Sequence, residues 1–180
     1  MLLDRHRSAL LVVDMQARLV PAIHEAAAVT ARVCLLLDAA RQLGVPVLAS
    51  EQYPKGLGPT VEPVAALLPE GAALPKTTFS CARDPRLMAA IKGMDREQLV
   101  VCGVEAHVCV LQSAIELQEQ GFAVHVAADA VGSRQPLRRD LGLARMRHAG
   151  CVIVDTEMAV FEWLREAGSD EFRALSRLVK

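Results

Sequence analysis

The chain has 180 residues, a formal net charge of −1, 52% hydrophobic residues and only 3% aromatic residues. A chain of this length fits one domain that buries a stable, mainly aliphatic core without disulfides or a structural metal. The balanced charge contains no block of like sign, which argues against nucleic acid or an anionic membrane as a partner.

Short apolar runs alternate with segments of helical periodicity along the whole chain. The apolar runs are too short for helices and predict strands at 8–14, 46–50, 72–76, 98–103, 123–129 and 152–155. The helical patterns, several of them ended by glycine, predict helices at 26–43, 84–92, 107–120, 136–149, 156–166 and 170–179. The segment 51–63 is rich in proline and glycine and is predicted to be a loop.

Strands that alternate with helices build right-handed βαβ units, which place helices on both faces of a parallel sheet. The first apolar run, SALLVVD, has apolar residues at even and odd positions, which is typical of a strand that is covered on both faces. The sequence therefore predicts an α/β fold, namely a three-layer α/β/α arrangement with a six-stranded, mostly parallel sheet, formed by a single domain over residues 1–180.

Cysteine usage and the N-terminus bear on cellular location. The five cysteines form no CxxC pair, and their odd number does not suit a disulfide framework, so a reducing compartment is expected. The first residues, MLLDRHR, carry charge where a secretory signal has an apolar stretch. The apolar runs are interrupted well short of a membrane span. We therefore expect a cytoplasmic protein with no membrane partner.

Ligands of open parallel sheets bind beyond the carboxyl ends of the strands, and this rule selects a short set of residues. Asp14 ends the first expected strand, where partial desolvation of the carboxylate suits a general base; the alternative is a cap for the segment that follows. Lys76 ends the third expected strand, either as a solvated lysine or as a cation that stabilises a nearby thiolate and carboxylate.

Cys109 lies in the first turn of the helix that is expected after the fourth strand. A helix N-terminus stabilises a thiolate, and its unpaired N–H groups can form an oxyanion hole. The alternative is a buried structural cysteine, which is the interpretation we give to Cys34, Cys102 and Cys151. His107 lies two residues away and either lines the pocket or serves as a cap or surface residue.

Motifs that bind metals or organic cofactors are missing from the sequence. The five histidines include no HExxH and no close pair, and both the GxGxxG and the GxxxxGK[ST] patterns are absent. We therefore expect no metal and no cofactor.

Three segments resemble the isochorismatase-like family of cysteine hydrolases: LLVVDMQ with Asp14, LPKTTFS with Lys76 and VVCGVEAHVCVLQSA with Cys109. The likeness runs from Ser8 to about Val160 and is nearest to the small isochorismatase domain-containing proteins of unassigned substrate. It implies a six-stranded parallel sheet and a triad in which Asp14 is the base, Lys76 its electrostatic partner and Cys109 the nucleophile.

The resemblance also implies an oxyanion site. Family members usually carry a non-proline cis peptide four residues before the cysteine, here Val104–Glu105, and the backbone amides of Glu105 and Cys109 would face the developing oxyanion. The implied reaction is hydrolysis of a small amide or related acyl compound through a covalent thioester at Cys109.

Two features limit the choice of reaction. The nicotinamidases of this superfamily have an Asp-x-His metal motif after the second strand, where this chain reads SEQYP from Ser50 to Pro54. True isochorismatases often lack the cysteine that is present here. Amide hydrolysis is favoured, and two alternatives stay open: a vinyl-ether hydrolase in which Asp14 acts alone, and a non-catalytic or redox-responsive protein with an exposed, reactive Cys109.

The small-molecule substrate is expected to lie beside further residues of the loops. We expect these to be Gln16, Tyr53, Phe79 and His107. Phe79 has a second interpretation as a core residue. The mobile segment 52–59 would act as a lid over the pocket or reach a neighbouring subunit.

The family commonly forms oligomers, so a homo-oligomer, either a dimer or a tetramer, is expected. The helix at 156–164, with Phe161 and Trp163, is a candidate interface. The alternative is that both aromatic rings pack on the sheet.

Overall fold

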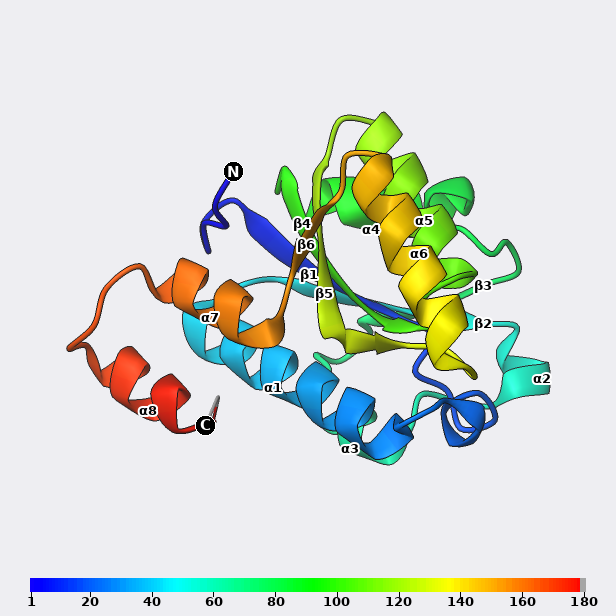
Figure 1. Cartoon of the computed structure of the whole chain (residues 1–180), viewed down its shortest axis with the longest axis horizontal. Coiled ribbons are helices and arrows are strands. Elements are labelled where there is room, and N and C mark those ends of the chain that lie inside the picture. The colour runs from blue at the N-terminus through cyan, green and yellow to red at the C-terminus, as the bar shows by residue number, and fades with distance from the viewer. Residues whose placement is uncertain (179–180) are drawn as a thin grey trace.

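The computed structural model describes residues 1–178, and Figure 1 shows a sheet between two layers of helices. Val179, the last residue of the final predicted helix, lies outside the described residues. In chain order the elements are β1 (Ser8–Val13), the 3-10 helix η1 (Val20–Ala22), α1 (Ala26–Leu43), β2 (Val47–Gln52), α2 (Pro54–Leu57), α3 (Glu62–Ala65), β3 (Ala73–Lys76), the 3-10 helix η2 (Cys81–Arg83), α4 (Pro85–Gly93), β4 (Gln98–Val104), α5 (Cys109–Glu119), β5 (Ala123–Gly132), α6 (Pro136–His148), β6 (Val152–Val154), α7 (Thr156–Leu164) and α8 (Asp170–Leu178).

The sheet has the strand order β3-β2-β1-β4-β5-β6, and every neighbouring pair is parallel. β1 and β4 lie at its centre, and all of their residues are buried. Val13 at the end of β1 pairs with Ser50 of β2 and with Gly103 of β4. The predicted six-stranded parallel sheet is confirmed, and the carboxyl ends of its central strands lie side by side.

Each face of the sheet is covered by its own group of helices. α1, α7 and α8 pack on one face with Leu10 and Val12, whereas α4, α5 and α6 pack on the other with Leu11 and Val13 (Figure 1). Successive side chains of a strand point to opposite faces, so the LLVV run of β1 contributes to both cores. None of the helices within residues 1–178 is long and apolar enough to cross a bilayer.

Of the two aromatic residues of α7, Trp163 follows the packing alternative, whereas Phe161 stays 38% exposed. Trp163 is buried in the core that α7 forms with α1, and Phe161 lies against Phe172 of α8 with the ring centroids 6.2 Å apart. These contacts hold α7 and α8 on the molecule. Trp163 is thereby buried within the monomer, whereas part of the Phe161 ring remains accessible.

Gly103 allows β4 to approach β1 closely. Its φ is 110°, and a Cβ at this position would overlap the carbonyl oxygen of Val13. Glycine adopts this conformation without strain, whereas a side chain here would push the two central strands apart. The segment that follows β4 is thereby held beside the end of β1.

Most predicted boundaries differ from the structure by no more than two residues, and two segments differ more clearly. The segment 51–63 is not entirely loop, because β2 runs to Gln52 and two short helices, α2 and α3, follow, each with a proline in its first turn. β5 runs to Gly132, three residues beyond the predicted end at Asp129. Asp129 therefore lies within β5 and not at its end. Its carboxylate accepts hydrogen bonds from the amide and the hydroxyl of Thr156, at 2.9 and 2.6 Å.

Candidate active site

A buried ion pair joins the ends of β1 and β3. Asp14 follows the last residue of β1 with a φ of 51°, a left-handed conformation that aspartate tolerates better than most residues. Lys76 is the last residue of β3, and its Nζ lies 2.7 Å from Asp14 Oδ2. Both side chains are 0% exposed. Since β2 lies between β1 and β3, the lysine side chain crosses the end of β2 to reach the carboxylate.

The ion pair has a full set of hydrogen-bond partners. Ser50 Oγ donates to Asp14 Oδ1 at 2.7 Å, so each carboxylate oxygen accepts a bond. Lys76 Nζ also donates to Gln52 Oε1 at 2.7 Å and to the carbonyl oxygen of Phe79 at 3.1 Å. An ammonium group has three donors, and all three are used here. The pair is therefore removed from water without leaving a polar atom unsatisfied, as a buried ion pair requires.

Cys109 is the first residue of α5, is only 6% exposed, and lies close enough to Asp14 to interact with its carboxylate. Burial raises the pKa of the Cys109 thiol, and Asp14 raises it further through its charge and as a hydrogen-bond acceptor, while Lys76 lowers it. Burial and Asp14 prevail, so the thiol keeps its proton at neutral pH. Cys109 therefore has neither the exposure nor the low pKa that the redox-responsive alternative requires.

The turn between β4 and α5 presents two backbone amides near the thiol. The Val104–Glu105 peptide bond is cis. The Ala106 amide donates to Gly132 O at 2.7 Å, and the Val110 amide donates to Glu105 O at 3.2 Å. Among the hydrogen bonds within the described part of the chain, neither the Glu105 nor the Cys109 amide is a donor. These two N–H groups remain available for a ligand oxygen.

Arg134 was not predicted, yet it lies beside this turn. The nearly buried Glu105 carboxylate accepts bonds from the backbone amide and from Nε of Arg134, at 3.0 and 3.1 Å. The Arg134 side chain is 54% exposed, so its guanidinium is anchored at one edge and open to solvent at the other. Arg134 follows the carboxyl end of β5 and could have been selected by the rule for strand ends. The strand was predicted to end at Asp129, so the residues after Gly132 were not considered.

The four predicted pocket residues differ in position. Gln16 is fully buried, and its side-chain amide bonds to the backbone of Gln52 and to the carbonyl oxygen of Gly58, so it holds the segment after β2 instead of facing a ligand. Tyr53 and Phe79 are more than half exposed. Phe79 is therefore not a core residue, and its carbonyl contact with Lys76 places it at the rim of the site.

The fourth residue, His107, lies just ahead of Cys109 in the chain. Its Nδ1 is 3.0 Å from the hydroxyl of Ser133. Partial burial lowers the pKa of His107, and the neighbouring Arg138 and Arg134 lower it further, against an opposing effect of Glu105. The imidazole is therefore neutral at pH 7 and serves as a polar neighbour of the site, not as a cation.

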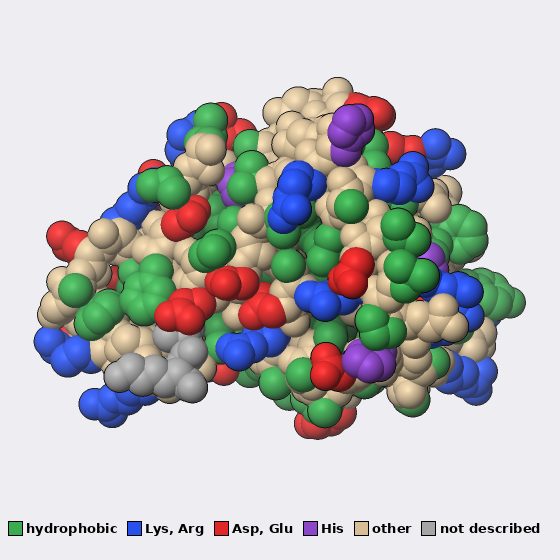
Figure 2. Space-filling view, viewed as in Figure 1, with side chains coloured by type: hydrophobic (Ala, Val, Ile, Leu, Met, Phe, Trp, Pro, Cys, Tyr) green, Lys and Arg blue, Asp and Glu red, His purple; other side chains and the backbone are tan. Residues whose placement is uncertain are grey.

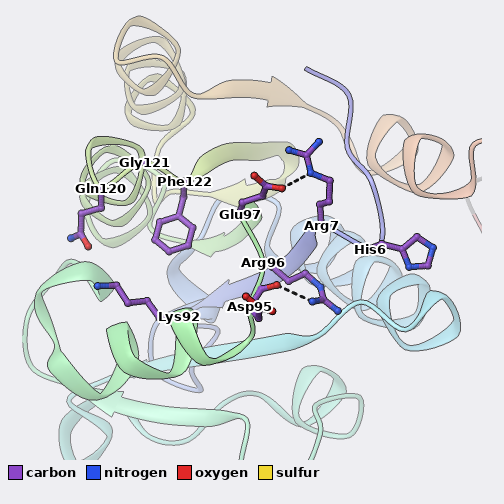
Figure 3. A pocket seen from close by; sticks show the side chains of 9 residues that line it. All are labelled: His6, Arg7, Lys92, Asp95, Arg96, Glu97, Gln120, Gly121 and Phe122. Carbon is purple, nitrogen blue, oxygen red and sulfur yellow. Dashed lines mark hydrogen bonds and ion pairs between the residues drawn. The ribbon is translucent and has the colours of Figure 1, made fainter.

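A hollow of the surface lies near the amino ends of β4 and β5, away from Asp14, Lys76 and Cys109. Figure 3 shows that Arg7 and Glu97 in its wall are ion-paired and that Arg96 bonds to the backbone of Asp95. Its volume is about 380 Å³, and its lining includes Phe122 but no cysteine, serine or threonine. It lies at the opposite edge of the sheet from Asp14, Lys76 and Cys109 and is therefore separate from the candidate active site. Within residues 1–178, no three His, Cys, Asp or Glu side chains are grouped as a metal site requires.

The fold and the cluster at the carboxyl ends of the strands define a parallel α/β protein of the isochorismatase-like type. The family model of the isochorismatase domain matches residues 8–158. The chain therefore belongs to the isochorismatase family. Isochorismatase domain-containing protein 2 of Danio rerio is 37% identical over 175 residues, which cover 96% of this chain and 86% of that protein.

Two solved structures extend the comparison. The MAR1 ribonuclease from Caenorhabditis elegans superposes with a TM-score of 0.92 and 33% identity, covering 99% of this chain and 92% of its own. YcaC from Escherichia coli, described as an octameric hydrolase of unknown specificity, superposes with a TM-score of 0.93 and 26% identity, covering 99% and 90%. The predicted family and fold are thus confirmed.

Proposed function

We propose that this protein is a cysteine hydrolase that cleaves small amides or related acyl compounds through a thioester at Cys109. One observation carries the proposal: a buried carboxylate, Asp14, is ion-paired to Lys76 and lies beside the Cys109 thiol. A carboxylate base beside a thiol is an arrangement that activates a weak nucleophile for acyl transfer.

The raised pKa of the Cys109 thiol sets the first step. The thiol keeps its proton until a substrate carbonyl arrives, and Asp14 then accepts the proton as sulfur attacks the carbonyl carbon. Lys76 stays charged and holds the carboxylate in place, while the hydroxyl of Ser50 fixes its other oxygen. The negative charge that develops on the carbonyl oxygen is stabilised by the amides of Glu105 and Cys109.

The second half of the reaction reverses the proton transfers. Asp14 gives its proton to the leaving nitrogen, the C–N bond breaks, and the acyl group remains on Cys109. Asp14 then takes a proton from a water molecule that attacks the thioester. The C–S bond breaks, the acid is released, and Asp14 returns the proton to the sulfur of Cys109. Apart from the substrate and water, the steps use only groups of this chain. His107, Tyr53 and Phe79 would lie beside the substrate.

Arg134 supports a narrower choice of substrate. Its guanidinium is bonded to the Glu105 carboxylate and open to solvent, so it could bind a carboxylate of the substrate in a charge-assisted way. A panel of small amides should therefore pair each neutral compound with an analogue that carries a carboxylate. The expected result is a lower KM for the anionic member, and this difference should be lost in Arg134→Gln.

The mechanism is tested by trapping the acyl-enzyme. Rapid quenching followed by intact-mass spectrometry should show an adduct on Cys109 with the mass of the acyl group, and Cys109→Ala should abolish both adduct and turnover. Turnover that survives in Cys109→Ala but is lost in Asp14→Asn would select the vinyl-ether alternative. A short RNA belongs in the panel, because the Caenorhabditis elegans relative is named a ribonuclease.

The redox-responsive alternative is disfavoured by the burial of Cys109 and by its raised thiol pKa, since oxidants react with exposed thiolates.

We further propose a cytoplasmic location and a homo-oligomeric state. The second is supported by the octameric state described for the Escherichia coli relative. Light scattering at several protein concentrations measures it directly.

A further inference from the structure

Polar side chains are dispersed on the surface but form a distinct group in the interior. On the face that Figure 2 shows, charged side chains of both signs are interspersed with apolar ones. Beneath the surface, Asp14 after β1, Ser50 of β2, Cys81 of η2 and Ser113 of α5 lie together, and each is at most 1% exposed. Asp14 and Ser50 belong to the candidate active site, whereas the proposed reaction does not use Cys81.

Cys81 is fixed beside the face of α5 that carries Cys109. Its backbone amide donates to Ser113 Oγ at 2.8 Å. Ser113 lies four residues after Cys109, so these two side chains are on the same side of α5, one helical turn apart. The Cys81 thiol is in hydrogen-bonding contact with the hydroxyls of Ser113 and Ser50.

The number of donors sets the direction of these bonds. A hydroxyl has one proton, and Ser50 donates it to Asp14 Oδ1 at 2.7 Å. Toward Cys81, the Ser50 oxygen is therefore the acceptor and the thiol is the donor. Burial raises the pKa of the Cys81 thiol, so the thiol has a proton to donate at neutral pH. The bonds form a directed chain from the Cys81 S–H to the Ser50 O–H and on to the carboxylate.

We propose that Cys81 is a positioning residue for the hydrolase reaction, because its S–H holds the Ser50 hydroxyl in the orientation that donates to Asp14. The inference rests on the proposed function for the role of Asp14 as the base. Hydrogen bonds in a chain polarise one another, so the bond from Ser50 to Asp14 is stronger while the thiol donates to Ser50. Cys81 is fully buried and its own amide is bonded to Ser113, so it is placed to orient the base and not to attack a substrate.

Substitutions of Cys81 separate its donor from its volume. Cys81→Ala and Cys81→Val both remove the donor, and the second keeps the space filled, whereas Cys81→Ser retains a donor. Cys151→Ala is the matched control, because Cys151 is also buried in the core on this face of the sheet and bonds to the carbonyl oxygen of Ala114. Circular dichroism checks that each variant is folded, and if Cys81→Ala unfolds, Cys81→Val decides.

The first readout is acylation of Cys109 by p-nitrophenyl acetate. The sulfur takes the acetyl group, p-nitrophenolate leaves, and Asp14 takes the thiol proton; the rate is the part that is absent in Cys109→Ala. It should fall roughly three- to tenfold in Cys81→Ala and Cys81→Val, recover in Cys81→Ser and stay unchanged in Cys151→Ala. Weakening the bond from Ser50 makes the carboxylate a somewhat stronger base, but a base out of line with the thiol accepts its proton less often, so the loss should prevail.

A double variant shows whether Cys81 acts through Ser50. Adding Cys81→Ala to Ser50→Ala should cause no further loss of rate, because the hydroxyl that the thiol orients is already gone. Independent effects on packing would instead multiply.

The second readout needs no turnover. NMR of the Asp14 carboxyl carbon follows its titration, and a carboxylate with a weakened hydrogen bond is protonated more readily. The titration should move to higher pH in Cys81→Ala and return toward that of the wild type in Cys81→Ser. Lys76 and Cys109, the other titratable groups beside this carboxylate, are the same in both variants.

The two readouts distinguish the inference from the proposed function. A wild type that is not acylated at Cys109, together with a displaced Asp14 titration in Cys81→Ala, overturns the thioester mechanism and supports the orientation of Asp14 by Cys81. An Asp14 titration that does not move in Cys81→Ala, or losses that multiply in the double variant, overturns the inference alone.

Discussion

Replacing Lys76 with methionine should destabilise the protein more than most single substitutions. The change keeps much of the side-chain volume but removes the cation 2.7 Å from Asp14, in a place where both side chains are 0% exposed. The carboxylate would stay buried with only the hydroxyl of Ser50 and the thiol of Cys109 as donors, and with no cation beside it. Breaking a buried ion pair in this way costs about 3–5 kcal/mol. In a domain of this size that corresponds to a fall in Tm of roughly 6–20 °C.

A second substitution separates the charge from the packing. Asp14→Asn combined with Lys76→Met removes both charges, and asparagine also tolerates the positive φ of 51° at this position. A buried amide without partners costs less than a buried unpaired carboxylate, so the double variant should regain part of the stability that Lys76→Met loses. Catalysis should be lost in both variants.

Urea unfolding followed by circular dichroism at pH 7 provides the free energies. Lys92→Met is a matched control, because Lys92 is exposed and its replacement should change the free energy of unfolding by no more than about 0.5 kcal/mol. A loss of less than about 1 kcal/mol in Lys76→Met would refute the reasoning. So would a double variant that is as unstable as Lys76→Met, since the unpaired charge would then not be the cause.

Three further predictions concern the site and its support. Because burial and Asp14 raise the pKa of the Cys109 thiol, alkylation by iodoacetamide should be slow at pH 7 and should increase with pH, with its rise at a higher pH than for a free cysteine, as read by intact mass. Ser50→Ala removes a donor to Asp14 and should lower kcat roughly tenfold or more with little change in KM. Gly142→Ala places a Cβ 2.7 Å from the carbonyl oxygen of Ala106 and should lower the free energy of unfolding by about 1–3 kcal/mol in a urea titration.

Matched variants and contradicting results test these predictions. Ser50→Thr keeps the hydroxyl and should retain most of the activity; equal losses in Ala and Thr would assign the effect to packing. Gly93→Ala adds a Cβ with no atom within 4 Å and should be neutral or slightly stabilising. A Cys109 that alkylates faster than free cysteine at pH 7 would show that Lys76 outweighs burial.

Much of the sheet could be predicted because its strands are short, apolar and separated by helical patterns. The LLVV run of β1 is apolar at every position, as expected for a strand of a parallel sheet that helices cover on both faces. Leu10 and Val12 pack on one face, and Leu11 and Val13 on the other. The rule that ligands lie at carboxyl strand ends then selected Asp14, Lys76 and the turn before Cys109. The structure brings Asp14 and Lys76 into contact and Cys109 close to Asp14.

The remaining features depend on distances between strands, which a single sequence does not contain. Ser50 reaches Asp14 because the register of β1 and β2 pairs Ser50 with Val13. Arg134 was missed because β5 continues past Asp129, whose carboxylate is satisfied from α7. The direction of the Cys109 pKa shift depends on burial against the charges of its neighbours, and burial is a property of the folded chain.

The reach of Lys76 across the end of β2 has a consequence for the order in which the molecule forms. The ion pair joins residues 62 positions apart in the chain, and it exists only when β1, β2 and β3 are all in place. Contacts between distant residues form late because the intervening chain must first give up its freedom, and neither charge gains by leaving water before the other is there to meet it. We therefore expect the ion pair at the reactive centre to form only after these three strands have come together.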